Sequence, residues 1–280
     1  MVRIITDSTA DLTERLAART EVVPLTIRFG EDEYVDGVTI NKKEFYEKLI
    51  ESDVLPTTSQ ATPDDFSDVF KKVADAGDSA VVITLSSKLS GTYQSATIAA
   101  QDYEGRIFVV DSNSVAIGEG ILVDYAHSLV LRGMDARTVA KELLAKRENV
   151  RVIAMLDTLE YLKKGGRISA STAFAGGLLM IKPVVCICDG EVKMLGKARG
   201  SKAANNLLIT EIEKAGGVDF EEPLLLGYTG ISKVLLEKYI EDSGALWRHA
   251  KDALEAVQIG SVIGTHVGPG TVAVAFFKRG

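Results

Sequence analysis

The chain has 280 residues, of which 46% are hydrophobic and 25% charged, and this composition excludes extended disorder. Its 32 Lys and Arg against 39 Asp and Glu leave a net charge of −7, which argues against a protein that coats nucleic acid or an anionic membrane. A single hydrophobic core rarely grows past about 250–300 residues, so the length favours two domains.

Short β-rich runs alternate with helical patterns through the first half of the chain. Asn41 with Glu44 forms the pattern of a reciprocal helix cap, and Thr62 precedes Pro63 at the start of another helix. Strands joined by helices favour a parallel sheet covered on both faces, so we predict an α/β N-terminal domain over residues 1–150. The expected strands are 2–6, 21–27, 79–85, 106–111 and 150–156, and the expected helices include 63–76, ending at Gly77, and about 120–132, ending at Gly133.

The second half mixes hairpin signals with helical patterns. Asp189-Gly190 is a strong turn signal between two β-rich runs, 183–188 and 191–197. We therefore predict a second, two-layer α+β domain over residues 151–280, with a ligand site between the two domains. The other expected elements are a small-residue helical stretch at 169–175, helices at 202–215, 233–240 and about 247–257, and strands at 224–228 and 271–277.

Cys186 and Cys188 are too few and too close together for a disulfide framework or a four-thiolate zinc site. Their spacing places both on one face of a strand, where we expect buried, unreactive thiols. No signal peptide precedes the first strand, and no apolar run approaches the 18 residues that a membrane span needs. We expect a protein of the reducing cytoplasm.

The familiar catalytic signatures are absent, including the P-loop, the HExxH zinc motif, the GxSxG elbow and any Cys/His cluster. Three loops, 56–63, 86–93 and 264–270, instead concentrate hydroxyls and glycines. The first two lead into helices, whose N-termini offer unpaired N–H groups to an anion. For any single Ser or Thr, a helix cap or a turn remains the simpler explanation.

The three histidines differ in their surroundings. His127 lies in an apolar helical run and is expected to be structural, and His249 lies in a polar stretch and is expected at the surface. His266 lies in the third loop between glycines, where backbone can approach a ligand closely, and it is the candidate for a functional role.

Charge is distributed unevenly along the chain. Between Tyr161 and Lys202 there are eight basic residues and two acids, which gives +6 locally and −13 elsewhere. A solvated face is one explanation, and a docking surface for an anionic group or an acidic partner is the other. The basic residues are Lys163, Lys164, Arg167, Lys182, Lys193, Lys197, Arg199 and Lys202.

Six motifs, in the correct order and spread over residues 6 to 270, resemble the DegV family of bacterial fatty-acid-binding proteins. One departure is Ala61-Thr62, where family members commonly carry Pro-Ser; it affects the stiffness of the loop and leaves its hydroxyls in place. The motifs are TDSTADL from Thr6, TSQ from Thr58, LSGTY from Leu89, the stretch from Leu159 to Ile168, Lys182-Pro183, and IGTHVGPG from Ile263.

The resemblance implies a long-chain fatty acid buried within or between two α/β domains. Its carboxyl group would be hydrogen-bonded by Thr58 and Ser90, with His266 close by and Arg167 near the carboxyl end of the site. Backbone N–H groups of Gly91 or Thr92 would assist. An apolar tunnel would draw on Phe174, Leu178, Leu179, Met180 and Ile181, for which an ordinary core position is the alternative.

The resemblance further implies a carrier that is not itself an enzyme and needs no cofactor. It would present the acid to a separate ATP-dependent fatty acid kinase, which forms an acyl phosphate for phospholipid synthesis. We expect a monomer when the kinase is absent.

Two other classes of function stay open. A hydrolase could use Ser90 as nucleophile and His266 as base, although no elbow positions the serine and no acid is placed to orient the histidine. A nucleic-acid-binding regulator could use the basic stretch, which conflicts with the net acidity of the chain.

Overall fold

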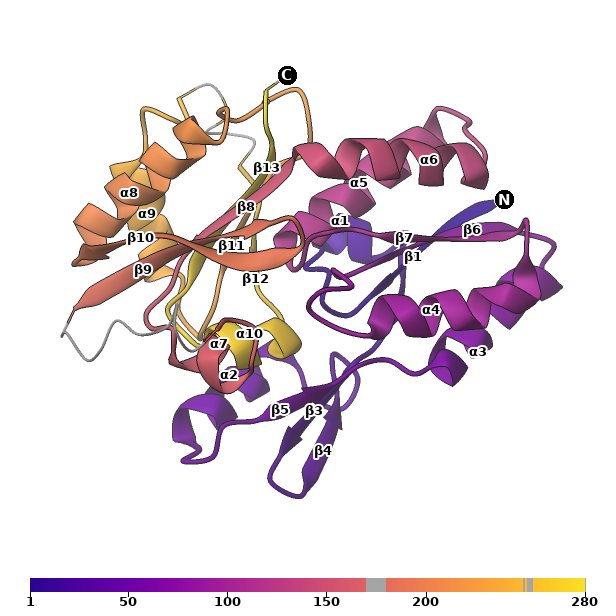
Figure 1. Ribbon diagram of the computed structural model, residues 1–280, viewed down its shortest axis with the longest axis horizontal. Coiled ribbons are helices and arrows are strands. Elements are labelled where there is room, and N and C mark those ends of the chain that lie inside the picture. Colours follow the sequence, from indigo (N-terminus) through magenta and orange to yellow (C-terminus); the bar gives the residue numbers. More distant parts are fainter. Residues whose placement is uncertain (170–179, 249, 251–253, 280) are drawn as a thin grey trace.

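The computed structural model describes residues 1–169, 180–248, 250 and 254–279. The first half of the chain forms β1 (Val2–Asp7), β2 (Glu21–Val23), β6 (Ser79–Thr84), β7 (Ile107–Asp111), α3 (Pro63–Asp75), α4 (Thr92–Ala100), α5 (Ile117–Leu131) and α6 (Ala136–Lys146), with short 3-10 turns at Gln101–Tyr103 and Arg147–Asn149. The four strands are parallel, in the order β2-β1-β6-β7. Helices α5 and α6 cover one face of this sheet and α3 and α4 the other (Figure 1), which confirms the predicted parallel sheet flanked by helices.

The start of two helices follows from their capping side chains. Helix α2 (Lys42–Glu51) begins at Asn41, whose side chain accepts the Glu44 N–H at 3.0 Å while the Glu44 carboxylate accepts the Asn41 N–H at 3.0 Å. Helix α3 begins at Thr62 in the same reciprocal way, with Asp65 as the partner. Both caps occupy N–H groups that the first helical turn leaves unpaired, so local sequence sets these boundaries.

The expected strand over 21–27 is wrong, because the chain forms two strands in two different sheets. Strand β2 ends at Val23, and Pro24, which has no N–H to donate, interrupts the ladder. The chain then enters a small antiparallel sheet in the order β4-β3-β5, below the parallel sheet in Figure 1. Its strands are β3 (Thr26–Phe29), β4 (Asp32–Val35) and β5 (Thr57–Ser59).

The second half forms a six-stranded sheet. Its strands are β8 (Val150–Met155), β9 (Ile181–Cys188), β10 (Glu191–Arg199), β11 (Leu225–Tyr228), β12 (Ala256–Gln258) and β13 (Val272–Phe277), and its helices are α7 (Glu160–Lys164), α8 (Ser201–Lys214), α9 (Val234–Asp242) and α10 (Ser261–Val267). The strand order is β10-β9-β8-β13-β11-β12. Helices α8 and α9 cover one face, and α5 packs on the other (Figure 1).

The β9–β10 hairpin turns where the sequence predicts it. Asp189 and Gly190 have φ angles of 55° and 78°, the left-handed geometry of a two-residue hairpin turn, and Glu191 pairs with Cys188. The expectation of free thiols is wrong, since Cys186 and Cys188 form a disulfide. Two residues apart on one strand face, their Cα atoms are 5.8 Å apart, within the roughly 4.4–6.8 Å that a disulfide spans.

Two further expectations in the second half are wrong. The expected helix over 247–257 is absent from its described part, because residues 256–258 form β12 and pair with β11, a tertiary contact that overrides local propensity. The loop expected at 264–270 is helical up to Val267. Position 264 requires a glycine because α10 packs closely against α2: a Cβ there would be 2.6 Å from the Tyr46 hydroxyl. The predicted helical stretch at 169–175 lies, apart from Ser169, outside the described residues, as does His249.

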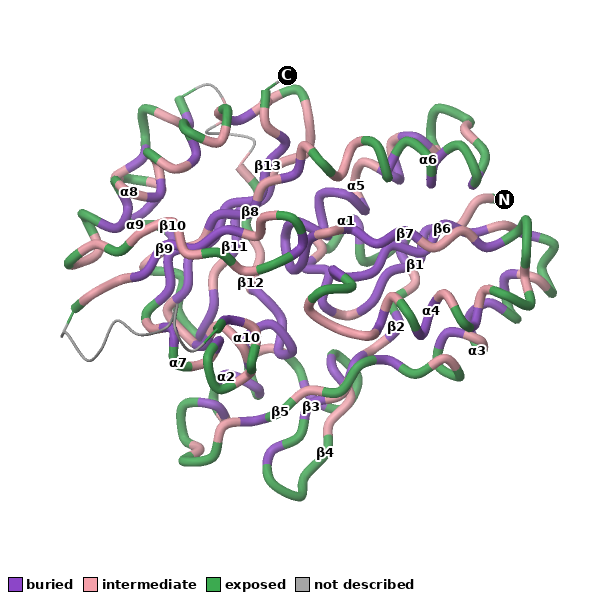
Figure 2. The backbone as a smooth tube through the Cα atoms, viewed as in Figure 1, coloured by how far each residue is buried: buried purple, intermediate pink, exposed green. Residues whose placement is uncertain are grey.

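The core runs through both halves of the described chain. Figure 2 shows the buried segments concentrated in the two large sheets and in the helix between them. One hydrophobic cluster extends from Ile5 in β1 through α5 to Phe277 in β13, and a second fills the space between the six-stranded sheet and α8. None of the helices in the described residues has the length and apolar character that a bilayer crossing requires.

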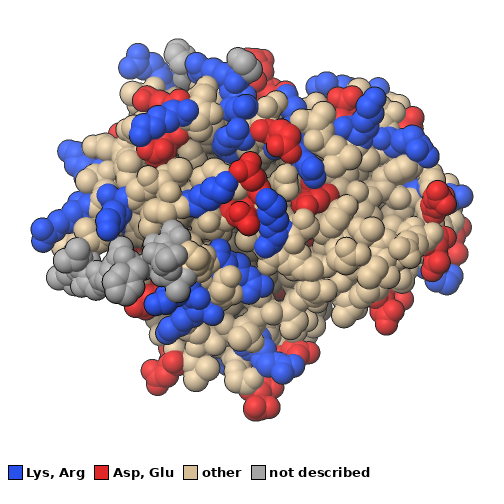
Figure 3. Space-filling model, viewed as in Figure 1, with Lys and Arg blue, Asp and Glu red and all other residues tan. Residues whose placement is uncertain are grey.

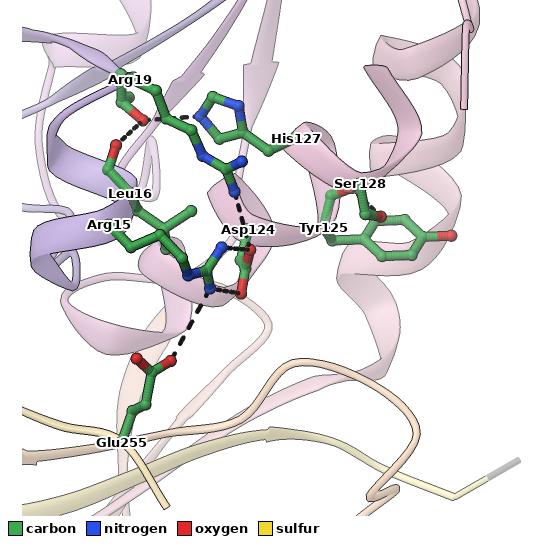
Figure 4. A network of polar contacts seen from close by, with 9 residues as sticks. Arg15, Leu16, Arg19, Asp124, Tyr125, His127, Ser128 and Glu255 are labelled. Carbon is green, nitrogen blue, oxygen red and sulfur yellow. Dashed lines mark hydrogen bonds and ion pairs between the residues drawn. The ribbon is translucent and has the colours of Figure 1, made fainter. Parts of the chain in front are cut away.

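A polar network ties α1 (Glu14–Ala17) and the turn after it to α5 (Figure 4). Arg15 pairs with Asp124 at 3.0 Å and lies 3.9 Å from Glu255, just before β12. His127 is buried and lies 2.8 Å from the Thr20 hydroxyl, in agreement with its expected structural role. Burial lowers the pKa of His127 to about 4, so the ring is neutral near pH 7.

Candidate ligand-binding site

A cavity of about 380 Å³ opens where the three sheets meet α7 and α10. This volume lies within the range of about 300 to 1,000 Å³ found for small-molecule sites. Hydrophobic side chains form most of its wall. They are Leu25, Leu85, Leu89, Val115, Leu162, Ile187, Val192, Val262, Ile263 and Val267; the remaining lining residues are Thr58, Ser59, Gln60, Ser90, Gly91, Arg167 and His266.

The apolar part of the cavity continues inward. A second, fully apolar space of about 50 Å³ shares Val115, Ile187 and Ile263 with the first and reaches Ala154 and Ala273 on the six-stranded sheet. The two spaces share part of their walls, so the apolar one lies next to the cavity on the side of the hydrophobic core. Such apolar walls suit a hydrocarbon chain better than a compact polar ligand.

The polar end of the cavity consists of Thr58, Ser90, Arg167 and His266. Thr58 lies on β5 opposite Ile27 of β3, and His266 lies in the last turn of α10. The Thr58 hydroxyl and His266 Nε2 are 2.9 Å apart. Residues 208 positions apart in the sequence are thus brought into hydrogen-bonding contact at the site.

Ser90 lies in the loop between β6 and α4. Its Oγ is 3.0 Å from Thr92 Oγ1 and accepts the Thr92 N–H at 3.3 Å. Gly91 precedes α4, which has no side-chain cap, and a Cβ at Gly91 would be 2.1 Å from Gln60 Oε1. Gly91 therefore allows the β5 segment to lie against this loop. Thr92 is fully buried beneath Ser90 and does not line the cavity.

Arg167 follows α7 and is half-buried. Its Nε donates to the Leu89 carbonyl at 3.3 Å, and its Nη1 donates to the Gly165 carbonyl at 2.5 Å. These bonds hold the guanidinium between the C-terminal half and the loop that carries Ser90. A positive charge is therefore fixed at the polar end, while no Asp or Glu lines the cavity among the described residues.

His266 has hydrogen-bonding capacity that the protein does not use. Burial, followed by the charge of Arg167, lowers the pKa of His266 to about 4, so its ring is neutral near pH 7. Its Nδ1 is buried without a partner among the described residues. A Cβ at Gly165 would be 2.3 Å from this Nδ1, so only glycine allows the ring to sit there. Buried polar atoms left unpaired in this way are characteristic of sites that bind a ligand.

The geometry does not support the hydrolase alternative. His266 Nε2 contacts Thr58, and the Ser90 hydroxyl contacts Thr92, so the described residues show no hydrogen bond between the proposed nucleophile and base. No cluster of His, Cys, Asp and Glu able to hold a metal ion occurs among the described residues.

Five of the six residues expected to bind the ligand, Thr58, Ser90, Gly91, Arg167 and His266, line the same cavity. Of the residues expected to form the tunnel, Met180 is 63% exposed and Ile181 is half-buried away from the cavity, whereas Phe174, Leu178 and Leu179 lie outside the described residues. Among the described residues, the apolar wall comes from side chains such as Leu25, Leu85 and Val115. Leu85 directly follows β6, and the carboxyl ends of parallel strands are where ligands bind, a signal the sequence does contain.

The fold and the cavity define an α/β ligand-binding protein with an apolar interior site and one basic, hydroxyl-rich end. The model of the family described as "Uncharacterised protein, DegV family" matches residues 1–279. A DegV domain-containing protein from Caldanaerobacter subterraneus is 36% identical, over 99% of both chains. The chain belongs to the DegV family.

Solved structures of DegV relatives have the same fold. A fatty-acid-binding DegV family protein from Thermus thermophilus is 32% identical, with a TM-score of 0.85 over 99% of both chains. A stearic-acid-binding protein from Eubacterium ventriosum is 26% identical, with a TM-score of 0.87 over 99% of this chain and 98% of that one. Both relatives therefore bind fatty acids.

Proposed function

We propose that this protein binds a long-chain fatty acid in the cavity, between an N-terminal domain of residues 1–150 and a C-terminal domain of residues 151–280. The observation that carries the proposal is the composition of the cavity wall. It is apolar except at one end, where Thr58, Ser90, His266 and Arg167 gather and no acidic side chain lines the wall. The fatty acids bound by the Thermus and Eubacterium relatives support the same ligand class.

The energetics favour such a ligand. Burying about 14 methylenes at about 0.8 kcal/mol each gives roughly 11 kcal/mol before the cost of ordering the chain. An unpaired carboxylate in the same place would cost several kcal/mol, so the site needs donors at one end only.

The polar end supplies those donors. In the Nε2–H tautomer, neutral His266 donates to the Thr58 oxygen, which leaves the Thr58 hydroxyl free to donate to the carboxylate. The Ser90 hydroxyl and the N–H of Gly91, just before α4, add to this, whereas the Thr92 N–H is already donated to Ser90; the Arg167 charge lies close by. Loops at the mouth of the cavity keep the carboxyl group within reach of a second protein.

The chain acts as a carrier and makes no bond itself. It presents the carboxyl group to an ATP-dependent fatty acid kinase in the cytoplasm, which forms an acyl phosphate for phospholipid synthesis, and it is a monomer when the kinase is absent. Figure 3 shows Lys and Arg gathered over β9, β10 and α8, whereas few charges lie over α4. Lys197 and Arg199 are exposed on β10, an edge strand of the sheet, and form the proposed kinase-docking face.

Native mass spectrometry of protein purified from bacteria tests the ligand class. The expected result is a mass increase equal to a long-chain fatty acid, which organic extraction releases. Absence of any acyl species, together with no binding of added long-chain acids, would rule the proposal out.

A further inference from the structure

The loop from Asp7 to Asp11, which follows β1, contacts the cavity walls without lining the cavity itself. Asp7 Oδ2 accepts the Leu85 N–H at 2.9 Å, and the Ser8 hydroxyl accepts the Leu25 N–H at 3.0 Å. Both leucines line the cavity. Two consecutive side chains of this loop thus accept backbone N–H groups from two different walls of the cavity.

The same loop holds the helix that carries His266. Asp11 Oδ1 accepts the N–H of Gly260, the residue that precedes α10, at 2.8 Å. The backbone of Asp11 also packs on α5, where a Cβ at Gly120 would be 2.3 Å from the Asp11 carbonyl oxygen. One buried loop therefore joins β3, the β6–α4 loop, α5 and α10, which together form much of the cavity.

The hydrogen bonds at Thr9 require a neutral acid. Thr9 Oγ1 lies 2.6 Å from Asp7 Oδ1 and 2.8 Å from Glu119 Oε2, yet a hydroxyl has one proton to donate. If both carboxyl groups were ionised, one of these short contacts would join two acceptors. One of the two carboxyl groups must therefore carry a proton.

The proton belongs to Glu119. Asp7 accepts hydrogen bonds from the Thr9 N–H, the Thr9 hydroxyl and the Leu85 N–H, as an ionised carboxylate does. Glu119 accepts one from the Thr6 hydroxyl, which leaves its other oxygen to donate to Thr9. Burial raises the pKa of Asp7 too, against the effect of its three donors, whereas burial and the negative charge of Asp7 raise the pKa of Glu119 well above its usual value.

The charges around Glu119 act in the same direction. The negative charge of Asp11 raises the pKa of Glu119 in the same way as that of Asp7. Lys42 pairs with Asp11 at 2.8 Å, and Asp36 lies on the far side of Asp11. The N-terminal end of α5 favours an anion, but this is a small effect beside burial next to a second carboxylate.

We propose that the Asp7–Asp11 loop positions the walls of the fatty-acid cavity, and that Glu119 serves in it as a neutral acid that donates to Thr9, so that Thr9 donates to Asp7. This inference rests on the proposed fatty-acid function. Asp7 and Glu119 are positioning residues, since neither lines the cavity.

Glu119→Gln is the discriminating variant. Its amide reproduces a neutral acid, because the oxygen accepts from Thr6 and the NH₂ group donates to Thr9. We expect palmitate affinity at pH 7 within about twofold of the parent, since every hydrogen bond is retained. Asp7→Asn presents an NH₂ group to one of its three donors, and we expect palmitate to bind about tenfold more weakly. Asp78→Asn is the matched control, because Asp78 lies at the opposite end of β6 and its carboxylate accepts from the N-terminus and Arg3 among the described residues.

The protonation state has its own measurement. Native Glu119 keeps a proton that the unfolded chain releases above about pH 4.5, so its contribution to stability is full below that pH and is lost as pH rises through the native pKa. The parent should therefore lose stability relative to Glu119→Gln as pH rises. Infrared difference spectra should contain the C=O stretch of a protonated carboxylic acid that Glu119→Gln removes.

Three results would overturn the proposal: a tenfold or greater loss of palmitate affinity in Glu119→Gln, no protonated band lost in that variant, or Asp7→Asn binding palmitate as tightly as Asp78→Asn. A parent protein that binds no long-chain acid would refute the proposed function instead. The infrared band is measured without ligand, so it separates these two failures.

Discussion

Two buried polar clusters lie on either side of Leu85, and they differ in how far their hydrogen bonds are satisfied. The carboxylate cluster, made of Asp7, Glu119 and their threonine partners, contains its own acids and its own donors. The polar end of the cavity contains the hydroxyls of Thr58 and Ser90 and the guanidinium of Arg167, with no acid among the described lining residues.

The difference indicates which cluster is structural and which binds a ligand. A fully connected buried network fixes the backbone around it, whereas a cluster of donors without an acceptor leaves a place for one. A fatty-acid carboxylate is the acceptor that the cavity lacks, and its acyl chain matches the apolar walls of the cavity. Variants that alter one cluster or its surroundings, and leave the other intact, test this difference.

The largest effect is expected from removing the donors of the cavity. Thr58→Ala with Ser90→Ala should weaken binding of a long-chain fatty acid about 100-fold, because each hydrogen bond to a charged group contributes about 1.5 kcal/mol or more. Titration with palmitate measures this loss. Thr57→Ala with Ser87→Ala is the matched control, since both side chains are exposed in the same two segments and should change the affinity by less than about twofold.

A smaller loss should follow from displacing His266 without altering it. Gly165→Ala places a Cβ at 2.3 Å from Nδ1 and must shift the ring, so palmitate should bind about tenfold more weakly. Gly244→Ala serves as the control, because a Cβ there meets two backbone oxygens at ordinary contact distances of 3.4 and 4.0 Å. Equal affinities for the two variants would mean that the His266 position does not matter for binding.

Acidification should destabilise the ligand-free protein through the same histidine. The native pKa of His266 is about 4, below the usual 6.5. Between these two pH values the imidazole is protonated in the unfolded chain and neutral in the native protein. This contribution to stability is full above pH 6.5 and is lost as pH falls towards 4. Urea unfolding of the parent and of His266→Gln between pH 7 and 4 measures it, and parallel pH profiles would contradict it.

The smallest effect on the cavity should come from the basic face. Lys197→Glu with Arg199→Glu should leave palmitate affinity unchanged and slow acyl-phosphate formation by the kinase several-fold, about three- to tenfold at low salt, because exposed charges act mainly on encounter rates. Lys72→Glu with Lys141→Glu reverses two exposed charges elsewhere and is the control. Equal kinase rates for both variants would place docking on another face.

The sequence predicted the parts of the fold that local chemistry decides. The caps at Asn41 and Thr62 and the turn at Asp189-Gly190 are in place because the side chains involved are neighbours in the chain. Helix α10 was missed because its glycines suggest a loop, whereas Gly264 is small in order to contact Tyr46, a residue more than 200 positions away.

Only the polar part of the site could be predicted from the sequence. The polar residues could be named from the motifs that resemble the family, and five of them line the cavity. The apolar wall could not be predicted, because Leu25 and Val192 line the cavity only after the small β4-β3-β5 sheet and the β9–β10 hairpin pack around it. The carboxylate cluster was equally hidden, since Thr6 and Thr9 meet Glu119 across more than 100 residues.

The most direct test compares palmitate with hexadecanol, which has the same chain length and no carboxylate, in the parent and in Thr58→Ala with Ser90→Ala. Two hydrogen bonds to a carboxylate predict that the parent prefers the acid by about 100-fold and that the double variant loses most of this preference. Equal affinity of the parent for the acid and the alcohol, or an unchanged preference in the double variant, would contradict the account.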